Sequence, residues 1–301
     1  MAILKSVFWL VAVAGFSAIA LSFSGQVWAW GDSLAVGRSW LALAGVVWVI
    51  SGLVLGGFGR RAGLVMSLVL LAVLAPIGWA KWRPEPAGPG DLAVYQKNML
   101  YALASFEALE ADIRAAGADF VTLQEVDPDN LGLLERLSDA YPHWHFCPFY
   151  QVVGGVSVAS KRPLLESRCG LGYAAAKVEG PGGPLWVVSL HLYWPAPRGQ
   201  WAQIAEIIPQ LQRLDAPVLM AGDFNMVPWS SAVARLEAAT KTHRVGRARI
   251  SITQFGGKLR LPIDHVLAPE TWRGRTEIRP RAGSDHKGVL MHLTLEDSKA
   301  R

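Results

Sequence analysis

Charged side chains are scarce in this sequence, and cysteines are scarcer still. Only 18% of the 301 residues are charged, against about 25% in an ordinary soluble domain, so part of the chain is expected to lie outside water. The two cysteines, Cys147 and Cys169, are too few for a disulfide-rich scaffold or a multi-cysteine zinc site. With 51% hydrophobic residues, the composition also excludes a disordered or fibrous protein.

Excess positive charge is confined to the N-terminal third. Residues 1–83 hold six basic residues and one acid, whereas residues 84–301 hold 23 of each sign. The net charge of +5 therefore belongs to the first segment. It is no evidence of a nucleic-acid-binding surface on the rest of the chain.

Uncharged apolar runs fill that first third, at residues 7–23, 40–58 and 63–80. Each is 17 to 19 residues long, close to the roughly 20 that cross a bilayer as a helix. None shows the polar face of a helix buried in a soluble core. We expect residues 1–83 to form a membrane anchor of three transmembrane helices. For the first run alone, a cleaved signal peptide is the alternative.

The short connections set the expected orientation of this anchor. Arg60 and Arg61 lie between the second and third runs, so the positive-inside rule places them in the cytoplasm. The loop expected at 24–39 and everything after Ala80 would then lie on the periplasmic or extracellular side of the cell membrane. Lys81 and Arg83 argue mildly for the reverse.

An outside location bears on the two cysteines. In an oxidising compartment Cys147 and Cys169 could pair, since strands expected nearby could make them neighbours. Two buried, unpaired side chains are as easily accommodated. The sequence leaves both alternatives open.

A proline- and glycine-rich linker at 84–90 cannot continue a helix and marks a domain boundary. Apolar periodicity in the remainder predicts alternating strands and helices. Strands are expected at 92–101, 118–126, 155–160, 185–192, 218–222, 263–268 and 287–295 and near 145–150, and helices at 106–116, 131–140, 197–214 and 232–239. This order predicts a layered α/β sandwich with mixed sheets.

Polar side chains gather where the expected strands end, and a rigid sheet would hold several of them together. They are Asn98, Glu125, His191, Asp223, Asn225, Asp264, Asp285 and His286. Such a set suits a hard divalent cation and a charged, oxygen-rich substrate. Singly, each has an ordinary alternative: a turn or helix cap for Asp223 and Asn225, or a hydrogen-bonded core position for His191.

The motifs around these residues resemble the endonuclease/exonuclease/phosphatase superfamily over residues 91–297. They are Leu123-Gln124-Glu125-Val126, Ser189-Leu190-His191, Gly222-Asp223-Phe224-Asn225, Ile263-Asp264-His265 and Ser284-Asp285-His286, preceded by Asn98. The resemblance implies a four-layered α/β sandwich of two mixed sheets flanked by helices. It also implies an enzyme that hydrolyses phosphoesters with Mg2+ or Mn2+.

Roles follow from the resemblance residue by residue. It implies Glu125 as the main metal carboxylate, with Asn98 beside it and Asp285 as a further contact. Asp223 would orient or deprotonate the attacking water, Asn225 would hold a phosphate oxygen, and His286, oriented by Asp264, would contact the phosphate. His191 matches a second histidine of the deoxyribonuclease and sphingomyelinase branches. One departure is Lys287-Gly288, where many relatives have a basic residue followed by proline.

Substrate identity is less well marked. Six basic residues and no acid occupy 241–260: Lys241, Arg244, Arg247, Arg249, Lys258 and Arg260. They could follow a nucleic-acid backbone, face anionic lipid headgroups or simply be solvated. Arg198 could reach substrate, although a solvated position is the simpler expectation.

Three functions remain. A membrane-tethered, nuclease-like phosphodiesterase is favoured. A lipid-phosphate hydrolase of the sphingomyelinase or phosphoinositide kind is the alternative, and a non-catalytic membrane protein that binds through the same fold is a third. The expected partners are a phosphoester substrate and the membrane, and no obligate protein partner is evident.

Overall fold

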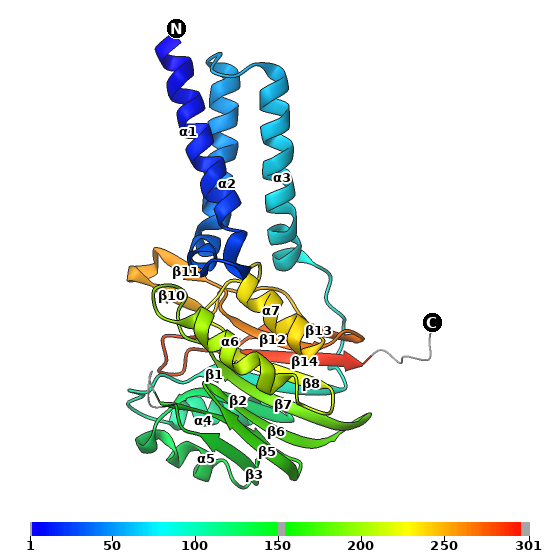
Figure 1. Ribbon diagram of the computed structural model, residues 1–301. Coiled ribbons are helices and arrows are strands. Elements are labelled where there is room, and N and C mark those ends of the chain that lie inside the picture. The colour runs from blue at the N-terminus through cyan, green and yellow to red at the C-terminus, as the bar shows by residue number, and fades with distance from the viewer. Residues whose placement is uncertain (1, 150–153, 296–301) are drawn as a thin grey trace.

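Two β-sheets packed face to face form the body of the molecule, and three long helices stand on one end of it (Figure 1). The computed structural model describes residues 2–149 and 154–295. Tyr150, in the strand expected near 145–150, and the last residues of the domain expected at 91–297 lie outside that range.

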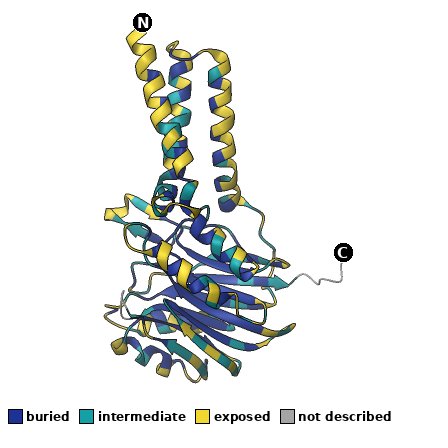
Figure 2. Cartoon of the chain, in the orientation of Figure 1, coloured by how far each residue is buried: buried dark blue, intermediate teal, exposed yellow. Residues whose placement is uncertain are grey.

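The N-terminal helices are α1 (Ala2–Leu21), α2 (Ala29–Val54) and α3 (Arg60–Trp82), and each is long and apolar enough to cross a membrane. Phe8, Ala42 and Leu70 pack between them. Much of their remaining surface is exposed, as the yellow faces in Figure 2 show, and many of the exposed side chains are large and apolar. Exposed apolar surface of this extent is typical of helices that face lipid.

The prediction of a loop at 24–39 is wrong. A 3-10 turn, η1 (Ser24–Gln26), leads into α2 at Ala29, so that helix begins well before the apolar run. Its first turns pack on the body. Asp32 accepts hydrogen bonds from the backbone N–H groups of Ser231 (2.7 Å) and Ala232 (3.0 Å). Polar residues that suggested a loop are helical because the body supplies their partners.

The strand orders of the two sheets are β13-β14-β1-β2-β4-β3 and β5-β6-β7-β8-β12-β9. The pairs β1/β2 and β7/β8 are parallel, and the other pairs are antiparallel. The first sheet contains β1 (Leu92–Asn98), β2 (Phe120–Val126), β3 (His143–Cys147), β4 (Gly155–Ser160), β13 (Trp272–Ile278) and β14 (Val289–Leu295). The second contains β5 (Leu164–Gly170), β6 (Tyr173–Gly180), β7 (Gly183–His191), β8 (Val218–Asp223), β9 (Thr242–Arg244) and β12 (Asp264–Pro269).

Helices cover the outer faces of both sheets. On the first sheet, α4 (Glu107–Ala116) and α5 (Gly132–Arg136), preceded by the 3-10 turn η2 (Pro128–Asn130), bury Leu109 and Leu133. On the second, α6 (Gln200–Leu211) and α7 (Ser231–Thr240) bury Ile207 and Val233. A separate apolar core that includes Val187 fills the space between the sheets. The predicted four-layered α/β sandwich is therefore confirmed.

Several elements differ from the sequence-based expectation. Strands β5, β6, β9 and β13 were not foreseen, nor was the hairpin of β10 (Ile252–Gln254) and β11 (Leu259–Leu261), joined by the 3-10 turn η3 (Phe255–Gly257). The last strand begins at Val289, so Asp285 and His286 lie in the preceding loop. Strands β9, β10 and β11 have three residues each, β6 is rich in alanine, and β5 and β13 carry charged side chains among few apolar ones. Such segments carry little apolar periodicity.

The proline-rich segment 84–90 is held against the body. Glu85 accepts hydrogen bonds from the backbone N–H groups of Arg247 (2.7 Å) and Thr276 (3.0 Å). Just before it, the Arg83 side chain donates to the carbonyl of Gly246 (2.7 Å). The segment is therefore packed along its course and is not a free spacer.

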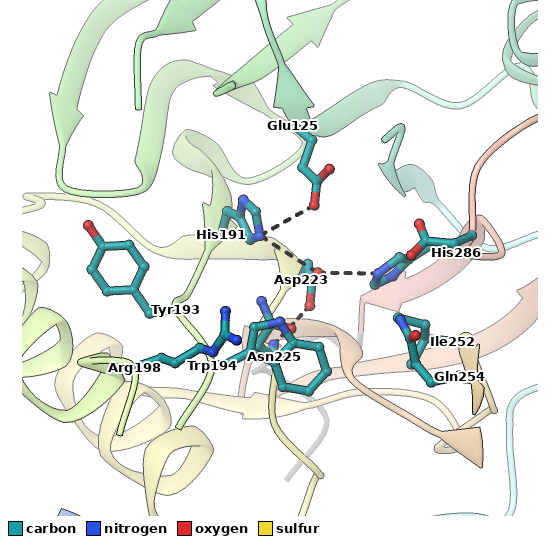
Figure 3. A pocket seen from close by; sticks show the side chains of 11 residues that line it. Glu125, His191, Tyr193, Trp194, Arg198, Asp223, Asn225, Ile252, Gln254 and His286 are labelled. Atoms are coloured by element: carbon teal, nitrogen blue, oxygen red, sulfur yellow. Dashed lines mark hydrogen bonds and ion pairs between the residues drawn. The ribbon is translucent and has the colours of Figure 1, made fainter. Parts of the chain in front are cut away.

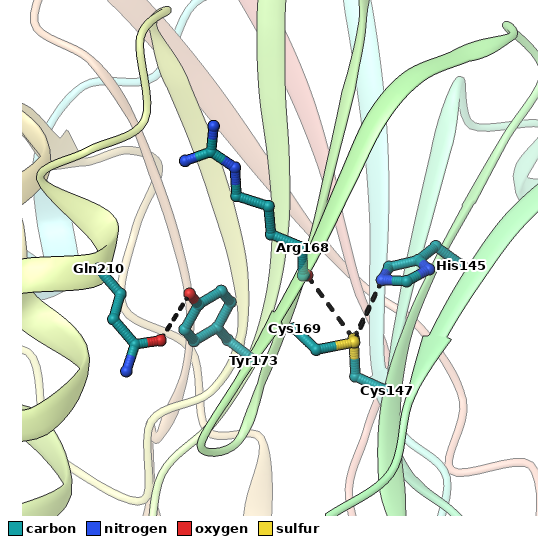
Figure 4. The surroundings of a disulfide bond; sticks show 6 residues. All are labelled: His145, Cys147, Arg168, Cys169, Tyr173 and Gln210. Atoms are coloured by element: carbon teal, nitrogen blue, oxygen red, sulfur yellow. Dashed lines mark hydrogen bonds between the residues drawn. A yellow bond between two sulfur atoms is a disulfide. The ribbon is translucent and has the colours of Figure 1, made fainter.

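A disulfide joins Cys147 on β3 to Cys169 on β5 (Figure 4). The two strands belong to different sheets, so the bond crosslinks the sandwich. His145 lies beside both sulfur atoms. The disulfide form excludes the thiolate ligands that a zinc ion at this cluster would need.

Candidate active site

All eight polar residues singled out in the sequence come to one edge of the sandwich. Asn98, His191 and Asp223 end β1, β7 and β8, and Asp264 begins β12, directly opposite Asp223. A cavity of about 600 Å3 lies there. Six of the eight residues line this cavity: Glu125, His191, Asp223, Asn225, Asp285 and His286 (Figure 3). Asn98 and Asp264 lie directly behind them.

Glu125 reaches the cavity from an irregular position in β2. The pairing register with β4 shifts between Gln124 and Val126, and Glu125 has a φ of 59°. Its carboxylate accepts hydrogen bonds from the Asn98 amide (2.9 Å) and the backbone N–H of Tyr101 (3.1 Å). Burial raises the pKa of Glu125 despite these bonds. A left-handed backbone at a glutamate costs energy, which is typical of functional sites.

Asp223 stands at the centre of the site. Its Oδ2 accepts from the Asn98 amide (3.0 Å) and lies 3.6 Å from His286 Nε2, and its Oδ1 accepts from the backbone N–H of Asn225 (2.8 Å). Burial raises the pKa of Asp223 to about 7, although the charge of His286 opposes the rise. A carboxylate with such a pKa can take up a proton near neutral pH.

His286 is held by a buried carboxylate. Its Nδ1 lies 2.9 Å from Asp264 Oδ2. Burial alone would lower the pKa of His286, but the charges of Asp264 and Asp223 outweigh it and raise the pKa to about 10. The pKa of Asp264 is lowered in turn. Burial alone would raise it, but the charge and the hydrogen bond of His286 outweigh that effect. The pair therefore presents an imidazolium whose Nε2 faces Asp223.

His191 is neutral by contrast. It is buried, and burial together with the charge of His286 lowers its pKa to about 3. Its Nε2 lies 4.0 Å from Glu125 Oε1 and 3.8 Å from Asp223 Oδ2. Its Nδ1 has no hydrogen-bond partner among the described residues. A neutral imidazole can donate to a phosphoryl oxygen without adding charge.

Sequence reasoning missed two buried residues of β1 that support the site. The Gln96 amide donates to Asp264 Oδ1 (2.7 Å), on the side of the carboxylate away from His286. Lys97 is buried, and its ammonium donates to the carbonyls of Arg281 and His286, each at 2.6 Å. Burial lowers the pKa of Lys97 to about 8. A lysine within an apolar strand would have been the only signal, and it does not show which loop the lysine holds.

The rim of the cavity comes from segments that follow β7 and from the β10–β11 hairpin. Tyr193, Trp194 and Arg198 line one side, and Ile252 and Gln254 line the other (Figure 3). Arg198, expected at a solvated position, is exposed but still lines the cavity. It adds a permanent positive charge at the mouth of the site.

The donor set fits a divalent cation. Glu125, Asp223 and Asp285 bring three carboxylates to one cavity, and Asn225 Oδ1 is buried without a partner among the described residues. Hard oxygen donors of this kind suit Mg2+ or Mn2+. Asp264 lies near enough to share an ion with Asp223 and His286. Its carboxylate is, however, already bonded to Gln96 and His286 and does not line the cavity, so Glu125 and Asp285 are the better carboxylate ligands. Asn98 lies beside Glu125, to which its amide donates.

Comparison with known proteins agrees with this geometry. The model of the Endonuclease/Exonuclease/phosphatase family matches residues 96–286. The search of curated proteins found no match.

Solved structures share the fold. Sphingomyelinase C from Streptomyces griseocarneus is 21% identical, with 66% of this chain and 98% of that chain covered and a TM-score of 0.50. D. rerio TDP2 complexed with a single-strand DNA product is 17% identical, with 67% and 98% covered and a TM-score of 0.54. A Staphylococcus aureus beta toxin variant with bound magnesium ions is 16% identical, with 67% and 99% covered and a TM-score of 0.50.

Proposed function

This chain belongs to the endonuclease/exonuclease/phosphatase family and is a phosphoester hydrolase, and from that premise we propose that it is a membrane-tethered phosphodiesterase that works with Mg2+ or Mn2+. The observation that carries the proposal is the placement of Asp223. A carboxylate with a pKa of about 7 lies 3.6 Å from a protonated imidazole, at the floor of the cavity.

The proposed reaction consumes one water and yields a phosphomonoester and an alcohol. Asp223 accepts a proton from the water whose oxygen attacks phosphorus, and the P–O bond to the leaving group breaks, after which the leaving oxygen takes up a proton. His286 and the Asn225 amide contact the phosphoryl oxygens, on which negative charge builds. Asp264 keeps His286 protonated and correctly turned.

Glu125, Asn98 and Asp285 are the residues that would hold the cation. When bound, it would offset charge on the phosphoryl oxygens and on the attacking water. The test is hydrolysis of a generic aryl phosphodiester by the full chain after treatment with EDTA. We expect the activity to vanish and to return with Mg2+ or Mn2+. Full hydrolysis by the metal-stripped protein would refute the dependence.

We further propose that residues 1–83 anchor the protein in the cell membrane and that the catalytic domain, 91–297, lies on the periplasmic or extracellular side. Three helices of membrane-spanning length support the anchor. Arg60 and Arg61, at the start of α3, support the orientation. The Cys147–Cys169 disulfide agrees with an oxidising compartment.

The basic stretch 241–260 gives little support to a nucleic-acid substrate. Arg247 donates to the carbonyl of Arg83 (2.9 Å), and Arg249 lies 3.9 Å from Glu85, so both hold the linker segment. Arg244 is buried and donates to the Gly246 carbonyl (2.9 Å). The hairpin residues Lys258 and Arg260 line a hollow with α2 and α3. This favours the lipid alternative over the nuclease-like one.

A further inference from the structure

A hollow of about 480 Å3 continues from the catalytic cavity toward α2. The two spaces share Trp194, Arg198 and Gln254 in their linings, so they lie side by side. One wall comes from the first turns of α2, through Ser33 and Val36. The opposite wall is the β10–β11 hairpin, so the hollow lies between the membrane anchor and the catalytic domain.

The lining of this groove is largely apolar. Val36, Pro197, Leu259 and Leu261 line it, and Phe255 at the hairpin tip remains 76% exposed. The Ser33 hydroxyl donates to the Ala196 carbonyl (2.9 Å), which fastens α2 to the segment that leads to Arg198. An apolar groove with a few polar groups at one end is complementary to an amphiphile.

At its far end the groove meets the level where α2 and α3 leave the body. A smaller hollow shares Val36 and Leu261 with it and is lined by Trp40, Lys81, Lys258 and Arg260. Tryptophan beside lysine and arginine is the composition of the headgroup level of a membrane. The groove therefore runs from that level to the catalytic cavity.

The hairpin connects this groove to the reacting centre as well. Ile252, the first residue of β10, pairs with His286 in an isolated bridge, and the backbone N–H of Lys287 donates to the Ser251 carbonyl (2.8 Å). A hydrocarbon chain that lies against the hairpin is therefore separated from the His286 imidazolium by β10 alone. A polynucleotide backbone has no apolar portion that would fill such a groove.

Given the proposed function, on which this step rests, we propose that the substrate is a long-chain phosphoester lipid of the leaflet next to the catalytic domain. Its phosphate lies in the catalytic cavity that Asp223 and His286 line, and its hydrocarbon chain lies in the groove between α2 and the β10–β11 hairpin. Lys81, Lys258 and Arg260 face the headgroups at the entrance.

Two synthetic esters with the same leaving group test this substrate class: methyl p-nitrophenyl phosphate and hexadecyl p-nitrophenyl phosphate. The full chain in detergent micelles with Mg2+ or Mn2+ should hydrolyse the hexadecyl ester with a kcat/KM at least about tenfold higher. Val36→Trp, which fills the groove, should reduce that ratio about tenfold. Phe255→Ser, at the exposed tip of the hairpin, should also reduce that ratio.

Leu165→Trp is the matched control, since Leu165 lies on β5 away from the groove and is 54% exposed. It should leave the ratio of the two esters unchanged. Equal hydrolysis of both esters by the natural chain, or a ratio insensitive to Val36→Trp and Phe255→Ser, would overturn the lipid groove and leave the phosphodiesterase intact. So would a single-stranded oligodeoxynucleotide cleaved faster than the hexadecyl ester. Hydrolysis of neither ester with metal present would instead reject the proposed function.

Discussion

Asp223 and His286 have opposite requirements for protons, and their environment meets both. Asp223 must be free of a proton to accept one from water, whereas His286 must keep its proton to stabilise the phosphoryl oxygens. Asp264 binds His286 Nδ1, and this leaves Nε2 of the same ring facing Asp223. Both pKa values are raised, that of Asp223 to about 7 and that of His286 to about 10, so near neutral pH a deprotonated carboxylate can lie beside a protonated imidazole.

The first prediction concerns these two residues. Asp223→Asn and His286→Ala should each lower kcat about a hundredfold or more, the usual range for a general base or a charge-stabilising group. Steady-state hydrolysis of an aryl phosphodiester with added Mg2+ measures the loss. His143→Ala on β3, outside the cavity, is the matched control and should retain full activity. Retention of most activity by either site variant would contradict the assigned roles.

A second prediction concerns His265, which is buried with its Nε2 2.8 Å from the Met226 carbonyl. Burial, followed by the charge of Arg244, lowers its pKa from the usual 6.5 to about 4. Between these values the unfolded chain binds a proton that the folded chain excludes. The free energy of unfolding should therefore fall as pH drops from 6.5 toward 4, by at most about 1.4 kcal/mol per pH unit from this group.

Thermal unfolding followed by circular dichroism at pH 5 and pH 7 checks this dependence. His265→Gln keeps a side-chain N–H but cannot titrate, so it should reduce the difference in melting temperature between the two pH values. An unchanged difference would show that His265 does not contribute to it.

Site residues were recognisable from sequence because each belongs to a short motif at the end of a strand. Glu125, Asp223 and His286 follow or precede apolar runs that mark those strands. Gln96 and Lys97 were not recognisable, because their roles depend on the loop at 280–286 and on β12, which lie far away in the sequence. A buried polar contact of this kind is specified only by the packed tertiary structure.

At the scale of elements, α7 is capped by a residue from another helix. The Ser230 hydroxyl accepts from the backbone N–H of Val233 (3.2 Å), and Asp32 from α2 accepts from Ser231 and Ala232. The carboxylate thus satisfies two N–H groups that a helix start leaves unpaired. Its negative charge is also favourable at the positive end of the helix dipole.

Asp32→Ala should therefore loosen α7 and its contact with α2. Loss of such a cap costs about 1 kcal/mol or slightly more. We expect faster hydrogen exchange at the backbone amides of Ser231 and Ala232 and a lower melting temperature of the full chain. Asp139→Ala, at an exposed ion pair with Arg114, is the matched control and should leave both unchanged. Unaltered exchange at these amides would contradict a capping role.

Helices and strands were predicted correctly where apolar periodicity was strong. They were missed where contacts with distant parts of the chain stabilise them. Strands β2 and β8, with runs of buried apolar residues, were found close to their true bounds. Strand β5 alternates between half-buried and exposed residues, and β6 begins with a tyrosine followed by three alanines. The first turns of α2 read as a loop because Asp32 and Arg38 find their partners only in the folded molecule.

The orientation of the whole molecule gives a fourth prediction. The positive-inside rule predicts a cytoplasmic location for Arg60 and Arg61, the first two residues of α3, so the C-terminus should lie outside. An alkaline phosphatase fused to the C-terminus should be active, and a green fluorescent protein fused there should be dark. The reciprocal pair fused after residue 58, in the α2–α3 connection, should give the reverse pattern. A fluorescent C-terminal fusion would place the active site in the cytoplasm.

Segment 84–90 is fixed along the body by Glu85, and Arg83 is bonded to Gly246. A loose tether would let the domain swing through a wide volume and sample solutes at any height above a bilayer. A fastened one allows only lateral drift and rotation about the membrane normal once the helices are inserted. Encounters are then a search in two dimensions, and their frequency is set by the number of target molecules per unit area of membrane. Diluting the surrounding solution should leave that frequency unchanged.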